Sequence, residues 1–275
     1  TAAPGDDIAE ERFTFDLFEG HPSPDGQYHY HSASPGPLEV LALAGQFRKT
    51  DQKLQDDAKK QLLAIGEAAM PLLFQQTSDR AEHTNPQLFA LFDEILKPAH
   101  AALMAREVKK PRVELRRYLV RRLCHFADTE MGPVFESMLK DKDEETVFYS
   151  QLGLLALKQT KVLPDVMNYC KAHWAAQGPL VAEVLTPARS HELGAAVFEA
   201  IAKLPAAEQM NGLRLARYLM VKDQTMILRH YLEAGEHTVK REAVNAARVL
   251  HGEPPIENLP VFQVIEHAKQ WLQKL

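Results

Sequence analysis

Cysteine, tryptophan, long apolar runs and enzyme signature motifs are scarce or missing in this sequence. Its two cysteines, Cys124 and Cys170, each sit in an apolar helical pattern, and neither has a Cys or His nearby at metal-ligand spacing. We therefore expect buried free thiols. No apolar run approaches the ~20 residues that span a bilayer. The chain has no glycine-rich phosphate loop, no Gly-x-Ser-x-Gly and no His-Glu-x-x-His, and we predict no cofactor.

Negative charge is concentrated at one end of the chain. The net charge of −5 gives no general argument for nonspecific binding to nucleic acid or anionic membranes. Residues 1–36 hold seven acidic residues against Arg12 alone, and residues 1–37 hold five of the 17 prolines. We therefore divide the chain into an acidic N-terminal arm or cap, residues 1–37, and a main domain, residues 38–275. The arm is also a candidate for self-association.

Within the arm, apolar or aromatic residues alternate with polar ones. The segments RFTFDLF (12–18) and QYHYHS (27–32) flank the turn-forming stretch HPSPDG, which predicts a β-hairpin with a long loop. In a strand His29 and His31 share one face, roughly 7 Å apart, and two imidazoles so placed form a candidate metal site. Alternatively, the histidines face water while the neighbouring tyrosines pack inward.

From residue 38 onward the hydrophobic period is helical, and proline recurs at related intervals. Pro71, Pro133, Pro164 and Pro260 are separated by 62, 31 and 96 residues, near multiples of about 31–32. Each is expected to open a helix, where its missing N–H costs nothing. An amphipathic helix is predicted before each: 51–64, 112–126, 143–157 and 237–250. The predicted unit is thus an antiparallel helix pair, and Gly178-Pro179 is among the predicted breaks between helices.

These pairs, with proline at the head of the second helix, resemble the HEAT-repeat family. The segments EETVFYSQLGLLAL (144–157) and HTVKREAVNAARVL (237–250) look like first helices of such repeats. The resemblance covers most of residues 50–275. It implies an all-α fold, a right-handed α-solenoid of stacked antiparallel helix pairs, with a concave groove suited to binding.

One segment is strongly basic in this acidic protein. Residues 106–122 hold eight basic and two acidic residues. A helical wheel places the arginines at 117 and 121 on an exposed face, and Arg116 near the buried stripe, where an acid of residues 141–145 is its expected partner. An acidic partner would dock here, or the segment is a solvated face with ion pairs between repeats. The candidate binding residues are Lys109, Lys110, Arg117, Arg121, Arg122 and Trp174.

These patterns favour a non-catalytic protein-interaction scaffold or adaptor whose partner has an acidic surface. Two alternatives remain: an enzyme or lyase with a pocket in the concave groove, and nucleic-acid or phosphate binding through the basic segment. The chain opens with TAAPGDD rather than Met, which is typical of a removed secretory signal. On that ground we expect a bacterial, periplasmic or secreted protein, with the cytoplasm as the alternative.

Overall fold

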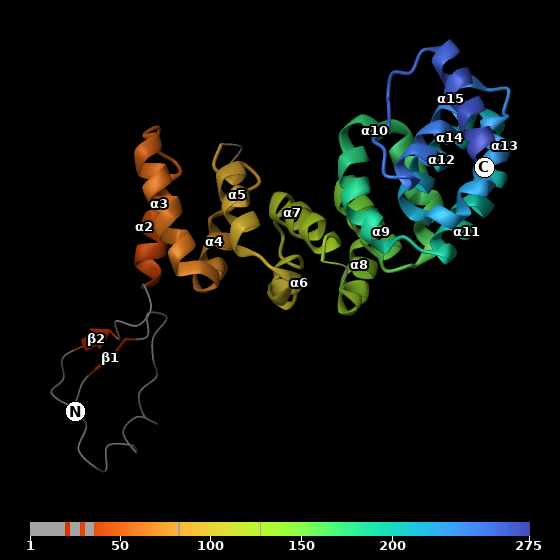
Figure 1. Ribbon diagram of the computed structural model, residues 1–275. Coiled ribbons are helices and arrows are strands. Elements are labelled where there is room, and N and C mark those ends of the chain that lie inside the picture. Colours follow the sequence, from red (N-terminus) through yellow and green to blue (C-terminus); the bar gives the residue numbers. More distant parts are fainter. Residues whose placement is uncertain (1–19, 23–27, 31–35, 82, 127) are drawn as a thin grey trace. The chain divides into compact units, whose positions relative to one another are not determined.

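The computed structural model describes residues 20–22, 28–30, 36–81, 83–126 and 128–275 (Figure 1). The chain divides into two compact units. Unit 1 comprises residues 1–100 and 110–115; unit 2 comprises residues 101–109 and 116–275. Apart from two short strands, the regular structure of these described residues is helical, as the sequence predicts.

Unit 1 contains the two strands and a set of short helices. Phe74 of α4 (Met70–Gln76) packs edge-on against Phe92 of α5 (Asn85–Ile95), with ring centroids 5.3 Å apart. Asp51 starts α3 (Gln52–Ile65) because its carboxylate accepts hydrogen bonds from the backbone amides of Lys53 and Leu54. The elements are β1 (Gly20–Pro22), β2 (Tyr28–Tyr30), α2 (Pro37–Gln46), α3 (Gln52–Ile65), η1 (Gly66–Ala69), α4 (Met70–Gln76), α5 (Asn85–Ile95) and η2 (Pro98–His100).

The strand pairing differs from the predicted hairpin. β1 pairs antiparallel with β2, and the register sets His21 opposite His29. The structure therefore does not support a hairpin between residues 12–18 and 27–32, because the pairing involves residues 20–22, while residues 12–18 lie outside the described residues. His31 lies outside them too, and the metal site at His29 and His31 stays a prediction.

Unit 2 holds most of the helices. They are α6 (Ala101–Glu107), α7 (Val113–Cys124, whose first turn belongs to unit 1), η3 (Thr129–Met131), α8 (Gly132–Met138), α9 (Glu144–Ala156), η4 (Thr160–Val162), α10 (Leu163–Leu185), η5 (Thr186–Ala188), α11 (His191–Ala202), η6 (Ala206–Glu208), α12 (Gln209–Leu219), η7 (Lys222–Leu228), α13 (Arg229–Leu232), α14 (His237–Leu250) and α15 (Val261–Lys274).

Proline and short polar side chains account for several helix starts. Pro71, Pro133 and Pro164 occupy the first turns of α4, α8 and α10, and Pro260 is the residue before α15. The predicted role of these prolines is thus confirmed. Asp143 caps α9 through the backbone amide of Thr146, and Ser190 caps α11 in the same manner.

The predicted helix break at Gly178-Pro179 is wrong. Helix α10 runs through both residues, and its departure from helical geometry comes earlier, at His173 (φ −116°, ψ 16°). Burial explains the difference: Gly178 is buried, and a Cβ added there would meet the Trp174 ring at 3.2 Å. Glycine here lets the indole lie against the helix, so this residue serves side-chain packing rather than a turn.

Within unit 2 the helices follow one another through direct contacts. α9 packs against α10, α10 against α12, and α12 against α14. Gly153 of α9 allows a close approach of the Phe135 ring from α8, which a Cβ would meet at 2.6 Å. These contacts set α10, α12 and α14 side by side, and these three helices carry the site described next.

Candidate binding cleft

Two arginines of the basic segment form ion pairs with residues 141–145. Arg116 Nε lies 2.7 Å from Asp141 Oδ2, which confirms the predicted partner. Arg117 Nη2 lies 2.6 Å from Asp143 Oδ1, and Arg117 Nε lies 2.9 Å from Glu145 Oε2. These contacts join α7 to the start of α9, so the two side chains take part in packing within the unit.

The other predicted basic residues remain at the surface. Lys109, Lys110 and Arg121 are exposed, and Arg122 is half-buried with its guanidinium carbon 5.4 Å from the centre of the Phe126 ring. Their role in binding stays a prediction.

Trp174, the other predicted binding residue, forms part of a cleft of ≈ 680 Å³ that we name the arginine cleft. The indole belongs to the stretch of α10 that follows the irregular residue His173. Helices α10, α12 and α14 supply the walls, and the connection between α14 and α15 closes one side. The lining residues are Lys171, Ala172, Trp174, Ala175, Gly178, Pro179, Arg214, Tyr218, Arg241, Pro255, Glu257 and Asn258.

A fully buried carboxylate, that of Glu242, organises the positive charge of the arginine cleft. Its Oε2 lies 2.7 Å from Arg217 Nη2, and both side chains have no exposed surface. Its Oε1 lies 3.2 Å from Arg241 Nη2 and 3.5 Å from Arg214 Nε. Glu257, half-exposed, adds a second contact to Arg217 at 3.3 Å. Three guanidiniums therefore share two carboxylates, which leaves an excess of positive charge.

Two aromatic rings lie beside these guanidiniums. The guanidinium carbons of Arg217 and Arg214 are 5.1 and 5.4 Å from the Trp174 ring centre, within the range of cation–π attraction. Trp174 and Tyr218 stack with centroids 6.5 Å apart. Burial raises the pKa of the Tyr218 phenol, so the hydroxyl keeps its proton and can donate a hydrogen bond.

The connection after α14 is fixed to the helix that precedes it. Asn245, which is fully buried, donates to the carbonyl of Ile256 at 3.1 Å and accepts from its amide at 2.8 Å. Arg248 Nε donates to the carbonyl of Pro254 at 2.9 Å. Since Glu257 and Asn258 follow directly, these bonds hold them at the edge of the arginine cleft.

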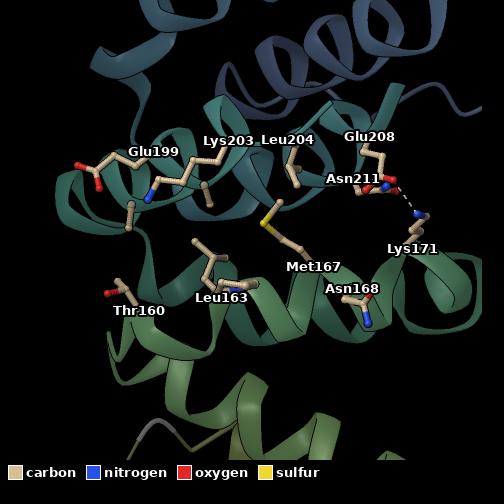
Figure 2. Close-up of a pocket in the computed structure, with 13 residues that line it drawn as sticks. Thr160, Leu163, Met167, Asn168, Lys171, Glu199, Lys203, Leu204, Glu208 and Asn211 are labelled. Carbon is tan, nitrogen blue, oxygen red and sulfur yellow. Dashed lines mark hydrogen bonds and ion pairs between the residues drawn. The ribbon is translucent and has the colours of Figure 1, made fainter. Parts of the chain in front are cut away.

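A second, smaller hollow shares Lys171 with the arginine cleft, and Figure 2 shows the residues that line it. We name it the side pocket; it has a volume of ≈ 410 Å³. Figure 2 shows Leu163 and Met167 on its α10 side facing Leu204 and Lys203, the residue that follows α11. Lys171 Nζ lies 3.1 Å from Glu208 Oε1 at the end of the side pocket.

In the described part of the chain, no group of three or more His, Cys, Asp and Glu side chains could hold a metal ion. Among helices of residues 36–81, 83–126 and 128–275, none has the length and apolar character that crossing a membrane requires. No family model matches the sequence, and no curated protein is significantly similar to it.

Of the residues predicted from the sequence to bind a partner, Trp174 lines the arginine cleft, whereas Arg214, Arg217, Arg241 and Glu242 were not predicted. A signal was present: Arg217 and Glu242 each fall on the apolar face of an amphipathic helix, between residues such as Leu213 and Val239 that are buried. Charged residues are almost never fully buried unless they are paired. Two such anomalies in neighbouring helices indicate a buried ion pair.

Proposed function

We propose that the chain is a non-catalytic protein-binding module of HEAT-like helical repeats that holds an acidic segment of a partner protein in the arginine cleft. The spacing of helices supports the repeat interpretation. The first helices of the proposed pairs start about 30 residues apart. The one interval that contains α10 is about twice as long, and there α10 continues past His173. Their first residues are Gln52, Asn85, Val113, Glu144, Gln209 and His237.

The observation that carries the proposed function is the excess of arginine in an open cleft. Arg214 and Arg241 are 14% and 20% exposed, so their guanidiniums are partly desolvated yet accessible from the cleft. A carboxylate arriving there gains charge-assisted hydrogen bonds in a lower dielectric than water. Trp174 and Tyr218 supply apolar walls of the kind that interface hot spots use.

A binding experiment with defined probes tests the proposed function. A fluorescein-labelled acidic peptide, rich in Asp and Glu, is titrated with the full chain at low salt, and its anisotropy is followed. We expect binding that weakens with added salt and that falls by about tenfold in the Arg214→Ala/Arg241→Ala variant. The matched control is Arg229→Ala, which removes an arginine of an exposed pair elsewhere in unit 2.

Two further arms separate the alternatives. If Arg117→Glu/Arg121→Glu abolishes binding and Arg214→Ala/Arg241→Ala binds like the wild type, the acidic peptide binds to the basic segment and not to the arginine cleft. A labelled DNA duplex that binds where the acidic peptide does not would replace the protein partner with a phosphate backbone. Equal binding by the wild type and all variants would overturn the proposed function.

A further inference from the structure

The side pocket and the arginine cleft form neighbouring parts of one surface of unit 2. Lys171 lines both, and its ion-pair partner Glu208 lines the side pocket. That pair is weak in energetic terms, because its side chains are 52% and 43% exposed. A ligand can therefore displace Glu208 from Lys171 at little cost and lie across both hollows.

The two hollows differ in chemistry. The side pocket has an apolar floor of Leu163 and Met167, both buried, and its opposite wall includes Ala196 and Ala200, four residues apart on α11. The alanines leave space that larger side chains would fill. Because methionine is flexible and polarisable, Met167 can adjust its contacts to different apolar groups.

The rim of the side pocket carries balanced charge. Lys203 and Glu199 lie on one side and the pair of Lys171 with Glu208 on the other (Figure 2). The side pocket thus has no preference for an acid, in contrast to the arginine cleft. With a volume of ≈ 410 Å³, it is large enough for an apolar side chain.

We propose that the partner segment is bipartite: an acidic residue enters the arginine cleft, and a large apolar residue (Leu, Ile, Met or Phe) a fixed distance along the same segment enters the side pocket. This inference rests on the proposed function and adds a second determinant to it. Charge complementarity selects the acidic residue, and burial of apolar area selects the other. The occupant is therefore a short stretch of a partner protein.

The experiment is a selection from a random peptide library displayed on phage, with the full chain as bait. Enriched peptides are expected to carry Asp or Glu at a constant spacing from a large apolar residue. Ala200→Tyr places a ring in the side pocket, and Ala196→Leu is a milder way to fill it. The matched control is Ala195→Tyr, at an exposed position of α11 outside the side pocket. Circular dichroism checks that each variant is folded.

The outcomes separate this inference from the proposed function. Filling the side pocket should remove the preference for the apolar residue, keep the acidic one, and weaken the best wild-type peptide by about tenfold or more. Enrichment of acidic residues without a fixed apolar position, or an unchanged selection with both pocket-filling variants, overturns the bipartite ligand and leaves the proposed function standing. Enrichment of neither residue type overturns both.

Discussion

Arg217 of α12 and Glu242 of α14 form a fully buried ion pair, with Nη2 and Oε2 only 2.7 Å apart. Taking both charges out of water costs several kcal/mol per ion, and the pair offsets that cost only if further hydrogen bonds are made. Arg217 donates a further hydrogen bond to Glu257 and Arg241 donates one to Glu242, while Arg214 Nε lies 3.5 Å from the Glu242 carboxylate. The buried pair therefore fixes the orientation of the arginines that face the arginine cleft.

The first prediction concerns the charge of Glu242. Glu242→Gln keeps the shape of the side chain but removes the buried carboxylate that pairs with Arg217 and leaves this arginine only the exposed carboxylate of Glu257, so we expect the free energy of unfolding to fall by about 3–5 kcal/mol. Both tryptophans, Trp174 and Trp271, lie in unit 2, so their fluorescence during urea unfolding reports on this unit.

The control for this experiment is Arg229→Ala. It removes a pair whose side chains are 53% and 57% exposed, and it should cost at most about 1 kcal/mol. If Glu242→Gln is no less stable than this control, the buried ion pair does not contribute to the stability of unit 2 as proposed.

Much of the helical pattern was predictable from local sequence. The helix predicted at 237–250 has those bounds in the structure, and the one predicted at 143–157 spans Glu144–Ala156. Amphipathic period, capping residues and proline positions are all encoded within a few residues of each helix, which is why they are visible without a structure. The prediction of a helix break at Gly178-Pro179 was wrong because the glycine there makes room for the ring of Trp174.

The arginine cleft was not predictable in the same way. Arg217 and Glu242 lie 25 residues apart, and so do Arg116 and Asp141. The Arg116 partner was found because residues 141–145 form an obvious acidic run, whereas Glu242 is a single acid in an apolar helix face. Their pairing depends on how successive helices pack, which a periodic pattern does not specify.

The second prediction tests the close approach of α8 and α9. Gly153→Ala adds a Cβ that would lie 2.6 Å from the ring of Phe135, which is itself buried. We expect a loss of about 1–3 kcal/mol in the free energy of unfolding, as is usual for overpacking. Gly235→Ala, with nothing within 4 Å of the new Cβ, is the matched control and should be neutral or slightly stabilising. Equal stabilities of the two variants would contradict the packing of Phe135 on Gly153.

The third prediction concerns the two thiols, which are free and buried, as the sequence predicts. Burial raises the pKa of the Cys124 thiol, and it raises the pKa of Cys170 to about 12. Since the thiolate is the reactive form, both should resist alkylation by iodoacetamide at mildly alkaline pH and react once urea unfolds the chain. Ala195→Cys provides an exposed thiol for comparison, and mass spectrometry assigns the labelled sites. Labelling of either native cysteine as fast as this thiol would contradict its burial.

The last prediction concerns acid stability. The hydrogen bond from Arg117 is the main cause that lowers the pKa of Asp143 from 3.8 to about 2. A carboxyl whose pKa falls on folding stabilises the fold above its unfolded pKa, and this contribution, about 2 kcal/mol, is lost as pH falls from 3.8 to about 2. Asp143→Asn retains an oxygen that can cap α9 but removes the charge. The difference in free energy of unfolding between wild type and Asp143→Asn should therefore be largest at neutral pH and shrink in this acidic window.

Arg117→Ala should reduce the change in the free energy of unfolding across the same acidic window, because it removes the main cause of the lowered pKa of Asp143. The destabilisation of the double variant should be smaller than the sum of the destabilisations of the two single variants. If the difference in free energy of unfolding between wild type and Asp143→Asn stays constant down to the acidic end of the window, the charge of Asp143 does not stabilise the contact between α7 and α9.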